Sequence, residues 1–198
     1  MLNKEREEFE EYPAFVFDTE RRILRDKRVV VLCDSIHRTS AKDFVEDIEI
    51  LASVGTEPIT IIIASDGGDV SPGLACIRAI TKAQSKGIKV IGEVHGHAMS
   101  MAFFILQWCD WRTMGKLCTL MAHGVTTFTI GDIRNIEAER KLLQYWRKEF
   151  SKFLAKRCTV RDSKYATEDF WLTILEDATP QFYDSEECLT MGLIDEVK

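Results

Sequence analysis

The chain has 198 residues, of which 45% are hydrophobic, and this is enough to bury one complete core. Its formal net charge is −6, and lysine and arginine do not gather in runs, so nucleic acid is not expected as a partner. The charged first eight residues are not followed by an apolar stretch, and no apolar segment reaches membrane-spanning length. We therefore expect a cytoplasmic protein that does not contact a membrane.

The six cysteines are scattered, and none forms a Cys-x-x-Cys pair. This pattern favours free thiols in a reducing compartment over a disulfide framework. Cysteine and histidine do not cluster as a zinc site requires, so no metal or other cofactor is expected.

Strand and helix patterns alternate through the first half of the chain, which indicates an α/β fold with parallel strands. Residues 1–17 are acidic and then aromatic, and we expect an amino-terminal arm followed by one domain over 18–198. Ser40 is a plausible N-cap for the first helix. Buried strands are predicted over 29–33, 59–64 and 88–94, and helices over 40–53, 71–86 and 99–109.

The second half is expected to begin with a strand over 117–122 and an extended segment over 124–130. Asp132 then caps a helix through Arg157, close to 40 Å long at about 1.5 Å per residue. Its near-heptad apolar positions favour packing against a partner subunit, the alternative being a position across its own sheet. The tail predicts helices over 167–176 and 185–191, an extended segment at 181–183, Gly192 as C-cap and a last strand over 193–197.

Ser100 is the strongest candidate for a catalytic residue. It lies in the segment Gly96–Ala102, directly after a predicted buried strand and at the start of a helix. The small residues around it allow a tight turn and leave room for a substrate carbonyl. A serine exposed in this way is how many hydrolases present their nucleophile.

Two other features also follow predicted strands. Gly67 and Gly68 come after the second strand, and His123 comes after the strand over 117–122. Ligands bind at the carboxyl ends of strands in open α/β sheets, so these residues are expected to converge with Ser100. Together they can supply a nucleophile, a base, and oxyanion donors in the backbone N–H groups of Gly68 and Met101.

At this point the sequence resembles the proteolytic subunit of the Clp protease, from about Asp18 to Val197. The resemblance rests on the Gly67–Gly68 loop, the segment 96–102, Met121-Ala122-His123, the long helix, and Gly192-Leu193-Ile194-Asp195. It implies a crotonase-like spiral of β-β-α units with a protruding handle over about 124–157.

The same resemblance implies a serine endopeptidase in which Ser100 is the nucleophile, His123 the base, and Gly68 and Met101 the oxyanion donors. It further implies a homo-oligomer of seven-membered rings, often stacked, that degrades unfolded polypeptides delivered by an AAA+ ATPase. The chain carries no Gly-x-x-x-x-Gly-Lys loop and is not expected to bind nucleotide itself.

The sequence departs from the family pattern around the site. Asp66 stands where the family usually has proline before the glycines, and His97 stands where it has glutamine. The glycine-rich stretch after the catalytic histidine is replaced by Val125-Thr126-Thr127-Phe128-Thr129.

Counting back from Gly192 places Pro180 at the position of the family's third triad member, and counting from Ser185 places Gln181 there. Asp177 is the nearest upstream carboxylate and is our candidate acid, whereas Asp184 is better placed to cap the following helix. The missing aligned acid leaves open a non-catalytic ring subunit. A phage-type or signal-peptide-degrading relative and a crotonase-type acyl-CoA enzyme are further alternatives.

Overall fold

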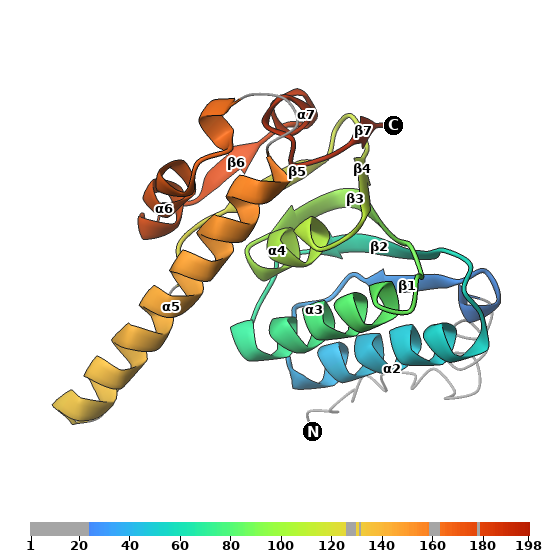
Figure 1. Cartoon of the computed structure of the whole chain (residues 1–198), viewed down its shortest axis with the longest axis horizontal. Helices are drawn as coiled ribbons and strands as arrows, with labels where there is room; N and C mark the ends of the chain where they lie inside the picture. The colour runs from blue at the N-terminus through green and yellow to red at the C-terminus, as the bar shows by residue number, and fades with distance from the viewer. Residues whose placement is uncertain (1–23, 126–129, 131, 159–162, 178) are drawn as a thin grey trace, which may run out of the picture.

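The computed structural model describes residues 24–125, 130, 132–158, 163–177 and 179–198. The expected arm over 1–17, and most of the segment predicted as extended over 124–130, lie outside these residues. Parallel strands in the order β1-β2-β3-β4-β7 form the main sheet, and β5 pairs in parallel with the end of β3 and antiparallel with β6 (Figure 1). The strands are β1 Val29–Leu32, β2 Ile59–Ser65, β3 Val90–Met99, β4 Trp111–Met114, β5 Thr119–Ala122, β6 Gln181–Tyr183 and β7 Glu196–Val197.

The helices are α2 Arg38–Val54, α3 Val70–Gln84, α4 Met101–Gln107, α5 Ile133–Arg157, α6 Glu168–Glu176 and α7 Ser185–Met191, with a 3₁₀ turn η1 at Ser163–Tyr165. Helices α2 and α3 lie side by side along one face of the sheet, and the amino-terminal end of α5 extends beyond the rest of the molecule (Figure 1). This is the mixed α/β architecture expected from the sequence, with a protruding helix.

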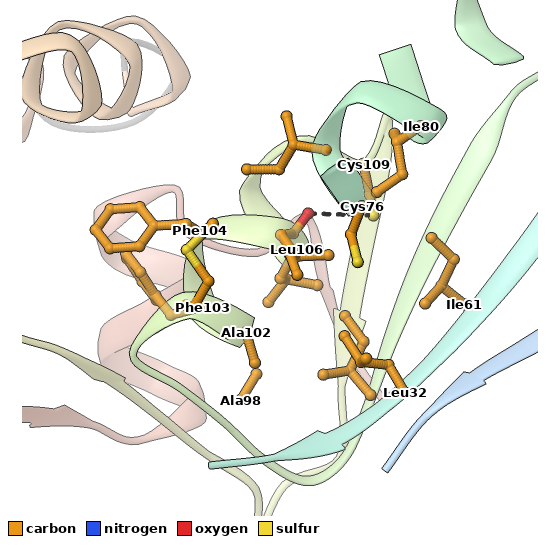
Figure 2. Close-up of a cluster of buried hydrophobic side chains, with 14 of the residues drawn as sticks. Leu32, Ile61, Cys76, Ile80, Ala98, Ala102, Phe103, Phe104, Leu106 and Cys109 are labelled. Carbon is orange, nitrogen blue, oxygen red and sulfur yellow. Dashed lines mark hydrogen bonds between the residues drawn. The ribbon is translucent and has the colours of Figure 1, made fainter. Parts of the chain in front are cut away.

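The core surrounds α4, whose seven residues are all buried. In Figure 2, Leu106 of this helix lies beside Cys76 of α3, and Phe103 and Phe104 lie on the opposite side of the cluster. Six of its seven residues are apolar, and a helix that is apolar on every side is stable only inside a core. The seventh, Gln107, is buried with its side-chain amide hydrogen-bonded to Leu193 and Arg112.

Most predicted elements are confirmed, but one strand was missed and several boundaries differ. The N-cap of α2 is His37, whose Nδ1 accepts hydrogen bonds from the backbone N–H groups of Thr39 and Ser40; the prediction of Ser40 was wrong. Ser40 instead completes a capping box from the third helical position, its hydroxyl accepting from the His37 N–H. Strand β4 was not predicted, and the strand expected over 193–197 covers only its last two residues.

Helix α5 begins where the sequence placed it, with the Asp132 carboxylate accepting from the backbone N–H groups of Arg134 and Asn135. Its carboxyl-terminal half packs within the chain and buries Phe150 and Leu154. Large apolar side chains of its amino-terminal half remain exposed, namely Ile133, Ile136, Leu142 and Tyr145. The carboxyl-terminal half thus packs against other elements of the same chain, and packing of the first half against a partner subunit stays a prediction. No helix in the described parts of the chain is both long and apolar enough to cross a membrane.

A buried ion pair joins the end of the chain to the sheet. Arg112 of β4 is 2% exposed, and its guanidinium donates to both oxygens of Asp195 at 2.9 and 3.0 Å and to Gln107 at 2.6 Å. Burial by itself raises the pKa of the Asp195 carboxyl, but the hydrogen bonds and charge of Arg112 more than offset it, so the pKa lies below its ordinary value.

We expect Asp195→Asn to lower the free energy of unfolding by about 3–5 kcal/mol at pH 7, because it leaves the Arg112 charge buried without its partner. A depressed carboxyl pKa stabilises the fold above the unfolded value of 3.8, and this contribution is lost as the pH falls through the folded pKa. In urea unfolding, the difference in the free energy of unfolding between wild type and variant should therefore be largest at pH 7 and should shrink as the pH falls below about 4. Glu49→Gln, which breaks an exposed pair with Lys82, is the control and should leave stability unchanged. A difference in the free energy of unfolding that does not change with pH would contradict this account.

The turn between β3 and α4 is strained at one residue. Ser100 has φ 52° and ψ −121°, a conformation that side-chain-bearing residues rarely adopt. It persists because β3 and α4 are both fixed in the core on either side of it.

Replacing Ser100 with glycine should therefore give a more stable protein than replacing it with alanine, by about 1 kcal/mol. Both variants lose the hydroxyl, so the difference isolates the backbone strain. Ala102→Gly, in the regular helix just beyond, should instead destabilise by about 1 kcal/mol. Thermal and urea unfolding of the three variants measure this, and an alanine variant at least as stable as the glycine variant would exclude strain at this turn.

Candidate active site

Ser100 and His123 meet side chain to side chain. The hydroxyl oxygen of Ser100 lies 2.9 Å from Nε2 of His123, within hydrogen-bond range, and both residues are partly exposed. A serine hydroxyl that donates to an unprotonated imidazole nitrogen has a base positioned to take its proton. The structure thus brings together two residues that are 23 positions apart in sequence.

Neighbouring strands hold this pair in place. Ser100 follows β3 and His123 follows β5, and the two strands are parallel, with Met99 in register with Met121. The backbone N–H of Ser100 donates to the carbonyl of Met121 at 2.9 Å, which extends the ladder into the turn. Parallel pairing therefore places both side chains at the same edge of the sheet.

The glycine loop lies against this turn from the other side. A Cβ atom on Gly67 would lie 2.5 Å from the Met99 carbonyl oxygen and 2.8 Å from the Met101 nitrogen. Gly67 also has φ 91°, so glycine is required there for two reasons, space and backbone conformation. The loop and the first turn of α4 are consequently in contact.

Gly68 is oriented by a parallel bridge to Ile36. The carbonyl of Gly67 accepts from the Ile36 N–H, and the N–H of Asp69 donates to the Ile36 carbonyl, both at 2.8 Å. In such a bridge the groups of the residue between, Gly68, face the opposite way. Met101 is the first residue of α4, so its N–H lacks a partner within the helix. These are the two N–H groups that the sequence suggested as oxyanion donors.

A small pocket of about 70 Å³ opens beside these groups. Gly68, Ser100, Met101 and His123 line it, and its remaining walls are mostly apolar: Val70, Phe104, Gly124, Val125 and Phe150. Phe150 comes from α5 and stacks on Phe104 with ring centroids 4.2 Å apart. Phe150 was not predicted as a site residue, because along the sequence it is only one of the apolar positions of the long helix.

Asp177 lies near this site, but its carboxylate is engaged elsewhere. It accepts from the backbone N–H of Thr179 at 2.8 Å, and this bond holds the pKa of the carboxyl below its ordinary value. The backbone carbonyl of Asp177 accepts from the N–H of Gly124, the residue after His123. Asp184 caps α7, as expected. In the described parts of the chain no carboxylate is hydrogen-bonded to His123.

In the part of the chain that the structure describes, cysteine and metal-ligating side chains do not form a second reactive site. All six cysteines are free thiols, and burial raises the pKa of Cys76 and Cys109 to about 12, so these two are not nucleophiles. Over the described ranges no three histidine, cysteine or acidic side chains are grouped so that they could hold a metal ion.

The chain is similar to known proteins over most of its length. The model of the Clp protease family matches residues 14–198. The chain is 25% identical over 175 residues to the ATP-dependent Clp protease proteolytic subunit 2 of Pseudomonas aeruginosa, an alignment that covers 86% of this chain and 80% of that protein. On the family match, which spans the whole described fold, the chain belongs to the Clp protease family.

Proposed function

We propose that the protein is a serine endopeptidase that cleaves unfolded polypeptides through an acyl-enzyme intermediate. The observation that carries the proposal is the 2.9 Å contact between the Ser100 hydroxyl and His123 Nε2 at a strained turn beside a small, mostly apolar pocket. Strained backbone at a residue with an activated side chain is typical of catalytic sites. Membership of a peptidase family supports the same chemistry.

In this mechanism the Ser100 oxygen attacks the carbonyl carbon of a peptide bond while its proton passes to His123 Nε2. The N–H groups of Gly68 and Met101 donate to the resulting oxyanion, each worth about 2.7–4 kcal/mol in the transition state. The carbon–nitrogen bond then breaks, and His123 gives its proton to the leaving amine. Water attacks the serine ester with His123 again as base, which releases the new carboxyl end and restores Ser100.

The acid that orients His123 is, in this proposal, Asp177. Its backbone carbonyl accepts from the N–H of Gly124, the residue after His123, and in this proposal its side chain exchanges the Thr179 N–H for the imidazole. The observed position of the Asp177 carboxylate, on the Thr179 N–H, favours a second candidate function, a non-catalytic ring subunit. A Ser-His pair without an orienting acid is a weak catalyst.

The exposed apolar positions on the first half of α5 support assembly. A helix that leaves Ile133, Ile136 and Tyr145 in solvent is expected to bury them against a second copy of the chain. We propose a homo-oligomeric ring of seven subunits, which can stack on a second ring and take substrate from an AAA+ ATPase in the cytoplasm. The relative from Pseudomonas aeruginosa is named as an ATP-dependent proteolytic subunit, which supports this arrangement.

Labelling with a fluorophosphonate probe tests the nucleophile. We expect one adduct on Ser100 by peptide mass spectrometry, none in Ser100→Ala, and strongly slowed labelling in His123→Ala. Ser71→Ala, which removes an exposed serine at the start of α3, is the matched control and should label like wild type. Ser100→Ala should also reduce peptide hydrolysis by roughly 10⁶-fold without changing the oligomer seen by size exclusion. An assembled wild-type protein that takes no label would favour the non-catalytic subunit.

The candidate acid is tested by comparing two alanine variants. We expect Asp177→Ala to lower kcat by roughly 10⁴-fold, because His123 loses its orienting partner in the transition state. Asp184→Ala should lower stability by about 1 kcal/mol through the lost cap of α7 and leave kcat near the wild-type value. Equal kcat values in the two variants would show that Asp177 has no such role.

A further inference from the structure

The oxyanion loop and the serine turn are joined by a pair of side chains. Asp66 directly precedes Gly67, and His97 lies three residues before Ser100. His97 Nε2 lies 3.2 Å from the Asp66 carboxylate, with the two side chains 34% and 79% exposed. These are the two positions at which the sequence departs from the pattern it resembles on either side of the site.

The hydrogen bonds of the loop connect it to residues on the side away from Ser100. The Ser65 hydroxyl donates to the Asp34 carbonyl at 2.7 Å and accepts from the Gly67 N–H at 3.1 Å. Beyond it, the loop is bridged to Ile36, in the connection between β1 and α2. These bonds fix the loop against that connection; on the side of the serine turn, the loop is held by the close packing of Gly67 against the backbone of Met99 and Met101 and by the side chain of Asp66.

The backbone ladder between the two segments ends before the site. The last pair of β2 and β3 is Ser65 with Ala98, after a shift in register between Ile63 and Ser65. Among the residues described, the contact between the Asp66 carboxylate and the His97 ring then joins the loop to the serine turn through side chains.

We propose that Asp66 and His97 are positioning residues that hold the oxyanion loop at the distance from α4 at which the N–H groups of Gly68 and Met101 meet one substrate oxygen. The inference rests on the proposed peptidase function and adds a specific requirement to it. The two donors come from different segments, so a loop displaced by a fraction of an ångström would weaken one of their hydrogen bonds.

The charges around the pair leave it independent of other ion pairs. His95, on the same face of β3, pairs with Glu93 at 3.5 Å, and Glu93 also binds Lys198. From β5, the residue in register with His97 is the uncharged Thr119. Within the described structure, Asp66 is the one charged group in contact with His97.

The size of the expected effect follows from the exposure of the pair. A side-chain contact this exposed is weak, so removing either partner should slow the reaction by about three- to fivefold rather than abolish it. The contact acts on the oxyanion donors, which are used in the transition state, so kcat should fall while KM stays unchanged.

The experiment compares Asp66→Ala, His97→Ala and the double variant in the full-length protein, with peptide hydrolysis and the rate of fluorophosphonate labelling as readouts. Asp69→Ala and His95→Ala are matched controls, since Asp69 lies in the same loop without a side-chain bond to α3 and His95 lies on the same strand face. Each single variant should lower kcat and the labelling rate about three- to fivefold, the double variant should be no slower than the slower single variant, and both controls should behave like wild type.

Two results would overturn the proposal: single variants that match their controls, and single effects that multiply in the double variant. In either case the wild-type protein still labels on Ser100, so these results contradict the positioning role but not the proposed function. A wild-type protein that takes no label contradicts the proposed function and this inference together.

Discussion

The burial of α4 is the constraint on which the candidate site depends. All seven residues of this helix lie inside the core, so the helix can neither shift nor tilt toward solvent. Strand β3 must therefore end and α4 begin within one residue, and that residue, Ser100, takes φ 52°. Core packing holds the strain at the turn, and the same packing keeps the serine hydroxyl facing His123.

Around this turn the site is assembled from segments that are distant in sequence. Parallel pairing of β3 with β5 brings His123 alongside, and the bridge to Ile36 places Gly68 on the opposite side. Helix α5 adds Phe150 to the pocket wall while its first half leaves the body of the molecule. In the proposed ring, one rigid helix would thus connect the subunit contact with the pocket beside Ser100.

Sequence patterns predicted best where the signal is local. Asp132 was expected to cap α5 and Gly192 to end α7, and both do, the latter in the left-handed conformation that glycine tolerates. His37 was missed as the cap of α2 because histidine is a rare N-cap, and Ser40, three residues on, fits the usual preference. Strand β4 was missed because four residues with an exposed Trp111 give no alternation to detect.

The sequence by itself determined the fold class, the order of most elements and the proposal that Ser100 and His123 work together, because residue type, spacing and strand-end position are written along the chain. Only the tertiary structure decided which side chains meet there. It joined Asp66 to His97, brought Phe150 to the pocket, and turned the Asp177 carboxylate toward Thr179. These contacts depend on loop conformation and on packing between distant segments, which local sequence patterns do not encode.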